Sequence, residues 1–172
     1  MQSPIKYKTA YIGVLVALSL ILSYIESFIV IPIPIPGIKI GLSNLCVVIC
    51  LYLFGPVYGI MLSVVKALLC SLLFGNFNVL MYSLVGAILS SVVMALIMRV
   101  KSIHMPVVSA CGGVFHNIGQ FIVAYIILQS KGLLYYLPFL MIFGLLTGLI
   151  LGIVCNLIIP PIQKIIRKGV EL

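Results

Sequence analysis

The apolar positions of this chain occur in long continuous runs of about 20 residues, separated by short polar or proline-rich breaks. A helix of about 20 residues rises about 30 Å, which is the thickness of the hydrocarbon core of a bilayer. Strands of a transmembrane β-barrel alternate apolar and polar residues instead, and the sequence shows no such alternation. The pattern therefore predicts an all-α integral membrane protein.

The breaks divide the chain into six predicted transmembrane helices within a single transmembrane domain, residues 1–172. Glycine and proline mark the breaks, as at Gly55-Pro56, and the Pro160-Pro161 pair is expected to end the last helix because proline cannot continue the hydrogen-bonded ladder. The second helix is unusually short. The expected helices cover about residues 9–30, 42–54, 57–74, 78–98, 105–128 and 133–159.

The connection between the first two predicted helices, residues 31–41, is unlike an ordinary polar loop. It contains the sequence PIPIPGIKIG, in which three prolines alternate with isoleucine and Lys39 is the only charge. Each proline lacks an N–H and biases the preceding residue toward an extended backbone, so the loop is expected to be stiff. A stiff loop loses little entropy on closing, and we expect this one to be an outer lid over a pocket.

Charge is scarce and unevenly placed in a chain that is 64% hydrophobic and 7% charged, with a net charge of +8. If the N-terminus is inside, the outer connections contain only Lys39 and Lys131. Loops rich in Lys and Arg stay in the cytoplasm, so both termini are expected there, with the lipid bilayer and not nucleic acid as the partner of these charges. The inner cations are Lys6, Lys8, Arg99, Lys101, Lys164, Arg167 and Lys168.

Polar side chains inside the predicted helices mark a candidate binding site. Lys66 and His116 lie near the middles of the third and fifth helices, where an ionisable group costs about 2.5–3.5 kcal/mol to insert. His116 and Gln120 are four residues apart, and Asn117 lies on the adjacent row of the same helical face. We expect these four residues to line a substrate pocket, with Lys39 at its rim.

Three of the polar residues have a second interpretation. Glu26 either contributes to the pocket or neutralises Lys66 as a packing pair. Asn44 either contributes to the pocket or caps the N-terminus of the second helix. His116 either binds substrate or bridges two helices.

Small residues form rows on two of the predicted helices. On the first helix, Ala10, Gly13 and Ala17 lie on one side, where they could meet another protein. On the last helix, glycines recur every four residues from Gly144 to Gly152, a spacing that permits close backbone approach between helices. We expect the glycine ladder to pack internally.

Several kinds of chemistry lack their residues. The chain has no aspartate, no GxxxxGK[ST] loop and no Ser/His/Asp set, so ATP hydrolysis, magnesium-dependent diphosphate chemistry and triad catalysis are excluded. The five cysteines lie in apolar segments and are expected to be small buried hydrophobes. We therefore expect no enzyme activity, no catalytic residue, no metal site and no cofactor, and the positive polar set predicts an anionic ligand with an apolar or aromatic body.

Four stretches, PGIKIGLSN (36–44), residues 51–75, GGVFHNIGQFIVA (112–124) and YLPFLMIFGLLTGLILG (136–152), resemble the bacterial Gx transporter family, also labelled heptaprenyl diphosphate synthase component I. That family is similar in layout to the S components of energy-coupling factor transporters, which have six helices, cytoplasmic ends and an outer lid. The resemblance implies a multi-pass protein of the bacterial cell membrane. The family has arginine where Lys66 stands, and lysine lacks the two-pronged guanidinium that grips a carboxylate.

Three functions follow as hypotheses. In the first, the chain is the substrate-binding subunit of an energy-coupling factor importer for a small anionic or amphipathic, vitamin-like solute. The resemblance then implies a transmembrane coupling subunit, which meets Ala10, Gly13 and Ala17, and two ATPase subunits. In the second, the chain is a non-catalytic membrane subunit associated with heptaprenyl diphosphate synthesis. In the third, it is a stand-alone proton-coupled carrier that uses Glu26, Lys66 and His116.

Overall fold

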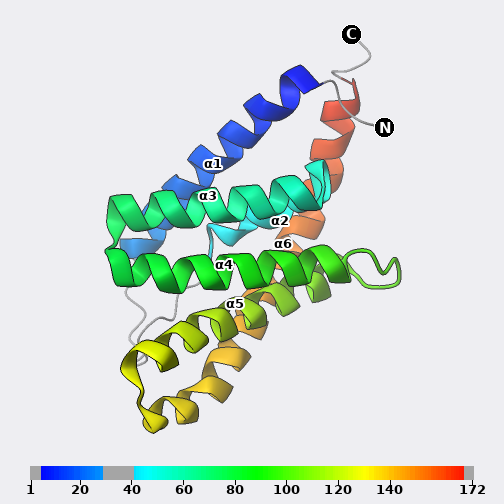
Figure 1. Cartoon of the computed structure of the whole chain (residues 1–172). Helices are drawn as coiled ribbons and strands as arrows, with labels where there is room; N and C mark the ends of the chain where they lie inside the picture. The colour runs from blue at the N-terminus through cyan, green and yellow to red at the C-terminus, as the bar shows by residue number, and fades with distance from the viewer. Residues whose placement is uncertain (1–4, 29–40, 169–172) are drawn as a thin grey trace.

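The computed structural model describes residues 5–28 and 41–168, which form helices and short connections with no strand among them. Residues 29–30 of the first expected helix, Lys39 and all of the expected lid except Gly41 lie outside the described residues. In Figure 1 the elements are α1 (Ile5–Phe28), α2 (Asn44–Phe54), α3 (Pro56–Phe74), α4 (Phe77–Ile97), α5 (Met105–Leu128), the 3-10 helix η1 (Lys131–Tyr136) and α6 (Leu137–Lys168).

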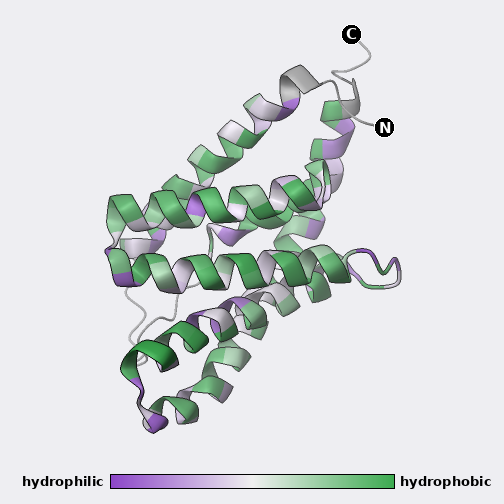
Figure 2. Ribbon diagram, in the orientation of Figure 1, coloured by the Kyte–Doolittle hydropathy of each residue, from purple (hydrophilic) through white to green (hydrophobic). Residues whose placement is uncertain are grey.

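Five of these helices are long and apolar enough to cross a membrane: α1, α3, α4, α5 and α6. Figure 2 shows that apolar residues run along the helices, whereas hydrophilic residues gather at the connections between α4 and α5 and between α5 and α6. The chain is therefore built as a membrane-embedded helical protein. The expected sixth span is not confirmed, because α2 has 11 residues and rises only about 16 Å.

The helices run back and forth across the bundle (Figure 1). The start of α1, the turn between α2 and α3, the connection between α4 and α5 and the end of α6 lie at one end, which we call the terminal end. The connections between α3 and α4 and between α5 and α6 lie at the other. Helices α3 to α6 pack as consecutive neighbours, α2 packs against α3 and α6, and α1 contacts α2 and α3.

The apolar core surrounds α2. Every α2 residue from Cys46 to Leu51 is buried, and residues from α3, α4, α5 and α6 complete the cluster around it. A helix that is apolar on all sides belongs inside a bundle. Three of the five cysteines, Cys46, Cys50 and Cys155, are fully buried here as expected, while Cys70 and Cys111 are only partly buried.

The glycine ladder of α6 packs against α5, as predicted. A Cβ atom placed on Gly148 would lie 2.5 Å from the backbone oxygen of Ser109, and one on Gly144 would lie 2.6 Å from the backbone oxygen of Gly113. These distances leave no room for any side chain larger than hydrogen. The ladder therefore brings the two backbones into direct contact.

The expectation that Pro160 and Pro161 end the last helix is wrong. Helix α6 continues through both prolines to Lys168, and the expected start of this segment forms η1 instead of α-helix. The prolines deprive the carbonyls of Asn156 and Leu157 of their helical donors, and all four residues are exposed, so these carbonyls can find other partners. The remaining helix ends lie within about four residues of the expected ones.

Candidate functional site

A pocket lies inside the bundle, and all six α-helices contribute residues to its wall. The cavity has a volume of about 90 Å³, which is room for several waters at about 10–15 Å³ each. A wall formed by every helix of an otherwise apolar bundle makes this pocket the first candidate for a binding site.

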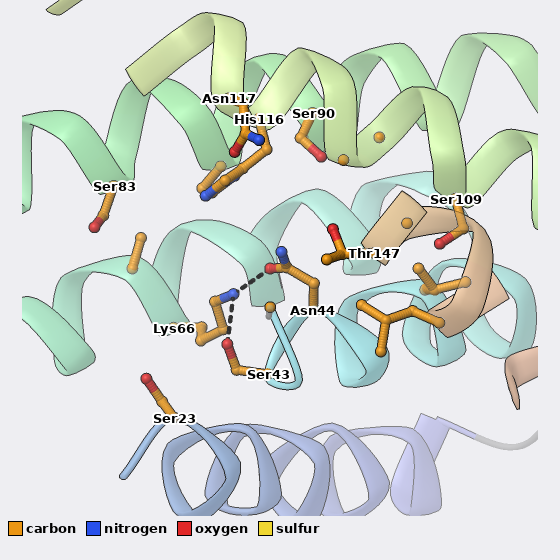
Figure 3. A pocket seen from close by; sticks show the side chains of 18 of the residues that line it. Ser23, Ser43, Asn44, Lys66, Ser83, Ser90, Ser109, His116, Asn117 and Thr147 are labelled. Atoms are coloured by element: carbon orange, nitrogen blue, oxygen red, sulfur yellow. Dashed lines mark hydrogen bonds between the residues drawn. The ribbon is translucent and has the colours of Figure 1, made fainter. Parts of the chain in front are cut away.

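Lys66 projects from α3 into the pocket (Figure 3). Its side chain is 7% exposed, and Nζ donates hydrogen bonds to Asn44 Oδ1 at 2.5 Å and to Ser43 Oγ at 3.3 Å. Ser43, not Asn44, occupies the N-cap position of α2, and its side chain makes no cap hydrogen bond. The expected pocket role of Asn44 therefore fits its contacts, and the alternative role as the helix cap does not.

The N-terminus of α2 lies at this pocket. Ser43, Asn44 and Val48, at the start of the helix, all border it. Helix N-termini carry a partial positive charge, and shortened membrane helices are known to direct it toward anionic ligands. The α2 dipole and the Lys66 ammonium both make the electrostatic potential in this part of the pocket more positive.

The predicted polar face of α5 lies on the opposite wall. His116, Asn117 and Gln120 all line the pocket, together with Gly112 and Gly113. Asn117 Nδ2 also donates to the backbone oxygen of Leu140 at 2.6 Å, which ties α5 to α6.

His116 also packs closely against α4. A Cβ atom on Gly86 would lie 3.1 Å from its Cε1 atom. His116 thus borders both the pocket and the α4–α5 contact, and the two interpretations of this residue both retain support.

Glu26 brings a carboxylate to the same pocket from α1. It is 7% exposed, and Oε1 accepts a hydrogen bond from the backbone N–H of Gly41. Gly41 has a φ of +79°, a left-handed conformation that glycine adopts without strain. The contact ties the end of α1 to the segment that precedes α2 and places a negative charge on the wall that also contains Lys66.

Sequence reasoning missed several hydroxyl groups in the wall. Ser83, Ala87 and Ser90 recur on one face of α4 at helical spacing, and this spacing was a signal that could have identified them. Serine is a weak signal in a membrane helix because its hydroxyl can bond to the backbone of its own helix. The missed wall residues with a hydroxyl are Ser43, Ser83, Ser90, Ser109 and Thr147.

The small-residue row of α1 lies away from the pocket. Ala10, Gly13 and Ala17 are all exposed, and a Cβ atom on Gly13 would meet no atom within 4 Å. The row is therefore an open surface.

Metal ligands do not gather in the described ranges 5–28 and 41–168: no three His, Cys, Asp or Glu side chains there are close enough to hold an ion.

Comparison with known proteins identifies the family to which the chain belongs. Neither a curated protein nor a solved structure matches the chain. The family model described as heptaprenyl diphosphate synthase component I matches residues 15–158, a range that contains the whole of α2 to α5 and most of α1 and α6. The resemblance to this family is thereby confirmed, and the chain belongs to the heptaprenyl diphosphate synthase component I family.

Proposed function

We propose that this chain is the substrate-binding membrane subunit, or S component, of an energy-coupling factor type importer, and that the pocket binds a small anionic or amphipathic, vitamin-like solute. One observation carries the proposal: Lys66, three amide side chains and His116 converge on a single pocket inside a membrane bundle. Ionisable groups in a membrane are costly and usually serve a ligand or ion. The proposed role requires no catalytic residue and no cofactor.

Anion preference follows from the charges around the pocket. The ammonium of Lys66 and the N-terminus of α2 both favour a negative group, and the amide N–H groups of Asn117 and Gln120 are further donors. Glu26 adds one negative charge to the wall, which favours a solute with a single negative charge over one with several.

The proposed topology places both ends of the chain in the cytoplasm of a bacterium. Helices α1 and α3 run in the same direction (Figure 1), so the proposed topology has the chain cross back between them, and α2 lies on that return. We propose that this return is the sixth crossing. The described cations of the terminal end, Lys8, Arg99, Lys101 and Lys164, agree with a cytoplasmic location.

The proposed partners are a transmembrane coupling subunit and two ATPase subunits. The open row of Ala10, Gly13 and Ala17 suits close contact with another membrane helix, because small residues let backbones approach. This row lies outside the pocket, so a coupling subunit could dock there while solute is bound.

Mass spectrometry of protein purified from its native membrane tests the binding role. We expect a retained small molecule in the wild type and in Lys101→Met, which removes an exposed cation, and its loss in Lys66→Met. Coupling and ATPase subunits should co-purify with all three. Absence of both solute and partners would contradict the proposal, and solute without partners would instead favour the proton-coupled carrier.

The family description favours a second candidate, a non-catalytic subunit associated with heptaprenyl diphosphate synthesis. Because the chain has no aspartate to hold magnesium diphosphate, a catalytic partner would be needed. Co-purification of a prenyl synthase, with no coupling subunit, would establish this alternative.

A further inference from the structure

The buried serines of this bundle differ in whether their hydroxyls find a partner within the protein. Ser91 of α4 is fully buried and donates to the backbone oxygen of Ala87 at 2.7 Å, and Ser19 of α1 likewise donates to Val16 at 2.7 Å. Ser90 and Ser109 are also buried, at 6% and 4% exposure, yet their hydroxyls make no hydrogen bond within the described residues. Both of these serines line the pocket, whereas Ser91 and Ser19 do not. Ser71 of α3 differs from both pairs, because its hydroxyl is enclosed without a hydrogen bond to any described residue and it does not line the pocket.

A buried hydroxyl without a hydrogen bond is unfavourable by about 1–3 kcal/mol. A serine within a helix can avoid this cost by bonding to a carbonyl of the preceding turn, as Ser91 does. Ser90, its neighbour in the chain, instead turns its hydroxyl toward open space. The same holds for Ser109 on the facing helix, so two hydroxyls without a partner among the described residues border one cavity, where water or a solute can bond to them.

The two hydroxyls lie across the pocket from Lys66. In Figure 3 Lys66 and Ser43 are on one side, Ser90 is beside His116 and Asn117 on the other, and Ser109 lies farther along near Thr147. Ser109 is about 16 Å along α5 from Gln120, toward the terminal end. The lining of the pocket therefore extends along α5, with Lys66 on one wall and the two hydroxyls on the facing wall.

Building on the proposed function, we propose that Ser90 and Ser109 form a second subsite, which binds the uncharged hydroxyl or carbonyl groups of the solute whose anionic group lies at Lys66. The solute is a compact, oxygen-rich monoanion. A solute whose body is pure hydrocarbon would displace water from both hydroxyls without replacing its hydrogen bonds.

Two monocarboxylates of similar size separate these solute classes. Threonate has three hydroxyl groups on a four-carbon acid, and hexanoate has none. Saturation-transfer NMR with the purified full-length protein in nanodiscs should show threonate binding at least about tenfold more tightly than hexanoate, because each hydrogen bond is worth about threefold to tenfold. Isopentenyl diphosphate, which has an apolar body and several charges, should bind more weakly than threonate.

Variants assign the preference to the two serines. Ser90→Ala/Ser109→Ala should lower threonate affinity about tenfold or more and leave hexanoate affinity unchanged. The matched control is Ser91→Ala, which should leave both affinities unchanged. Without solute, the double variant should melt no lower than the wild type, because it removes hydroxyls that the protein itself does not satisfy, whereas Ser91→Ala should melt lower.

The outcomes distinguish the subsite from the proposed function. Equal binding of threonate and hexanoate, or an unchanged preference in the double variant, would overturn the subsite while Lys66→Met still weakens both acids. Binding that is indifferent to Lys66→Met, or no saturable binding of either acid, would overturn the proposed function together with the subsite.

Discussion

The small-residue rows of α6 and α1 have the same sequence character and opposite surroundings. On α6, a Cβ atom at Gly148 would lie 2.5 Å from the α5 backbone, whereas on α1 a Cβ atom at Gly13 would meet nothing within 4 Å. Correspondingly, 33% of an 18-residue apolar stretch within Lys131–Ile166 is buried, compared with 11% of such a stretch within Lys8–Phe28 of α1. One row is a closed contact and the other is an open surface.

The difference shows what a small-residue row can and cannot indicate. Apolar surface gains little by leaving lipid for another helix, so association in a membrane depends on close packing. A glycine row marks a place where close packing is possible, and the other helices decide whether it is used. On α6 it fixes one wall of the pocket, and on α1 it leaves an open surface, where we propose that a coupling subunit docks.

The largest expected effect is on the closed row. Gly148→Leu should prevent correct packing of α5 on α6 and destabilise the fold by about 3 kcal/mol or more, since its side chain would overlap backbone atoms. Fluorescence-detected size-exclusion chromatography should show little monodisperse protein. Gly13→Leu is the matched control and should behave as the wild type; similar loss in both variants would remove the distinction between the rows.

The next effect concerns the open row and the proposed partner. Gly13→Leu should reduce co-purification of the coupling subunit at least about tenfold, because a bulky side chain keeps two helix backbones apart. Solute binding by the isolated subunit should persist. Val107→Leu, a change at an exposed position of α5, is the control, and undiminished co-purification of Gly13→Leu would show that the partner docks elsewhere.

A smaller effect is expected where a glycine faces a flexible side chain. A Cβ atom on Gly112 would lie 2.7 Å from Met94 Cγ, and methionine can change its rotamer to give way. Gly112→Ala should therefore cost about 1 kcal/mol, less than Gly148→Ala, which meets backbone. Thermal unfolding of the two variants measures this, and equal losses would mean that Met94 cannot move.

The smallest expected effect is a gain in stability, whereas the other glycine substitutions that change stability lower it. Gly13→Ala should raise stability by about 0.5–1 kcal/mol, because alanine is the better helix former and no atom obstructs its methyl group. The melting temperature should rise slightly. A lower value would indicate that the α1 surface is covered in the isolated protein.

Much of the fold could be predicted from the sequence, because a long apolar run has few other interpretations. The positions of α3, α4 and α5 and the internal packing of the glycine ladder agree with the expectations. The course of α6 beyond Pro160 could not be predicted, since a local helix-breaking signal was weaker than continuation of the helix. That α2 is a half-length helix enclosed on all sides depends on its neighbours, which local patterns do not specify.

The part of the candidate site that could be predicted from the sequence consists of side chains that are costly to insert into a membrane. Lys66 and His116 stood out because charge and imidazole are rare there, and both line the pocket with Asn117, Gln120 and Glu26. The serines did not stand out, because a hydroxyl that bonds to its own helix costs little. Only the geometry separates Ser90 from Ser91, adjacent residues of one type with different hydrogen bonding.

Cys70 allows a direct test of the central claim, that the Lys66 region of the pocket attracts anions. It lines the pocket one helical turn after Lys66 and is a free thiol. Its rates of modification by anionic methanethiosulfonate ethylsulfonate and cationic methanethiosulfonate ethylammonium can be followed by peptide mass spectrometry, which separates Cys70 from the other cysteines.

The ratio of the anionic to the cationic rate cancels any change in the reactivity of the thiol itself. We expect this ratio to be at least about tenfold higher in the wild type than in Lys66→Met, since a single charge a few ångströms away is worth more than 1 kcal/mol near a protein surface. The same ratio in both proteins, or no modification of Cys70 by either reagent, would contradict the account.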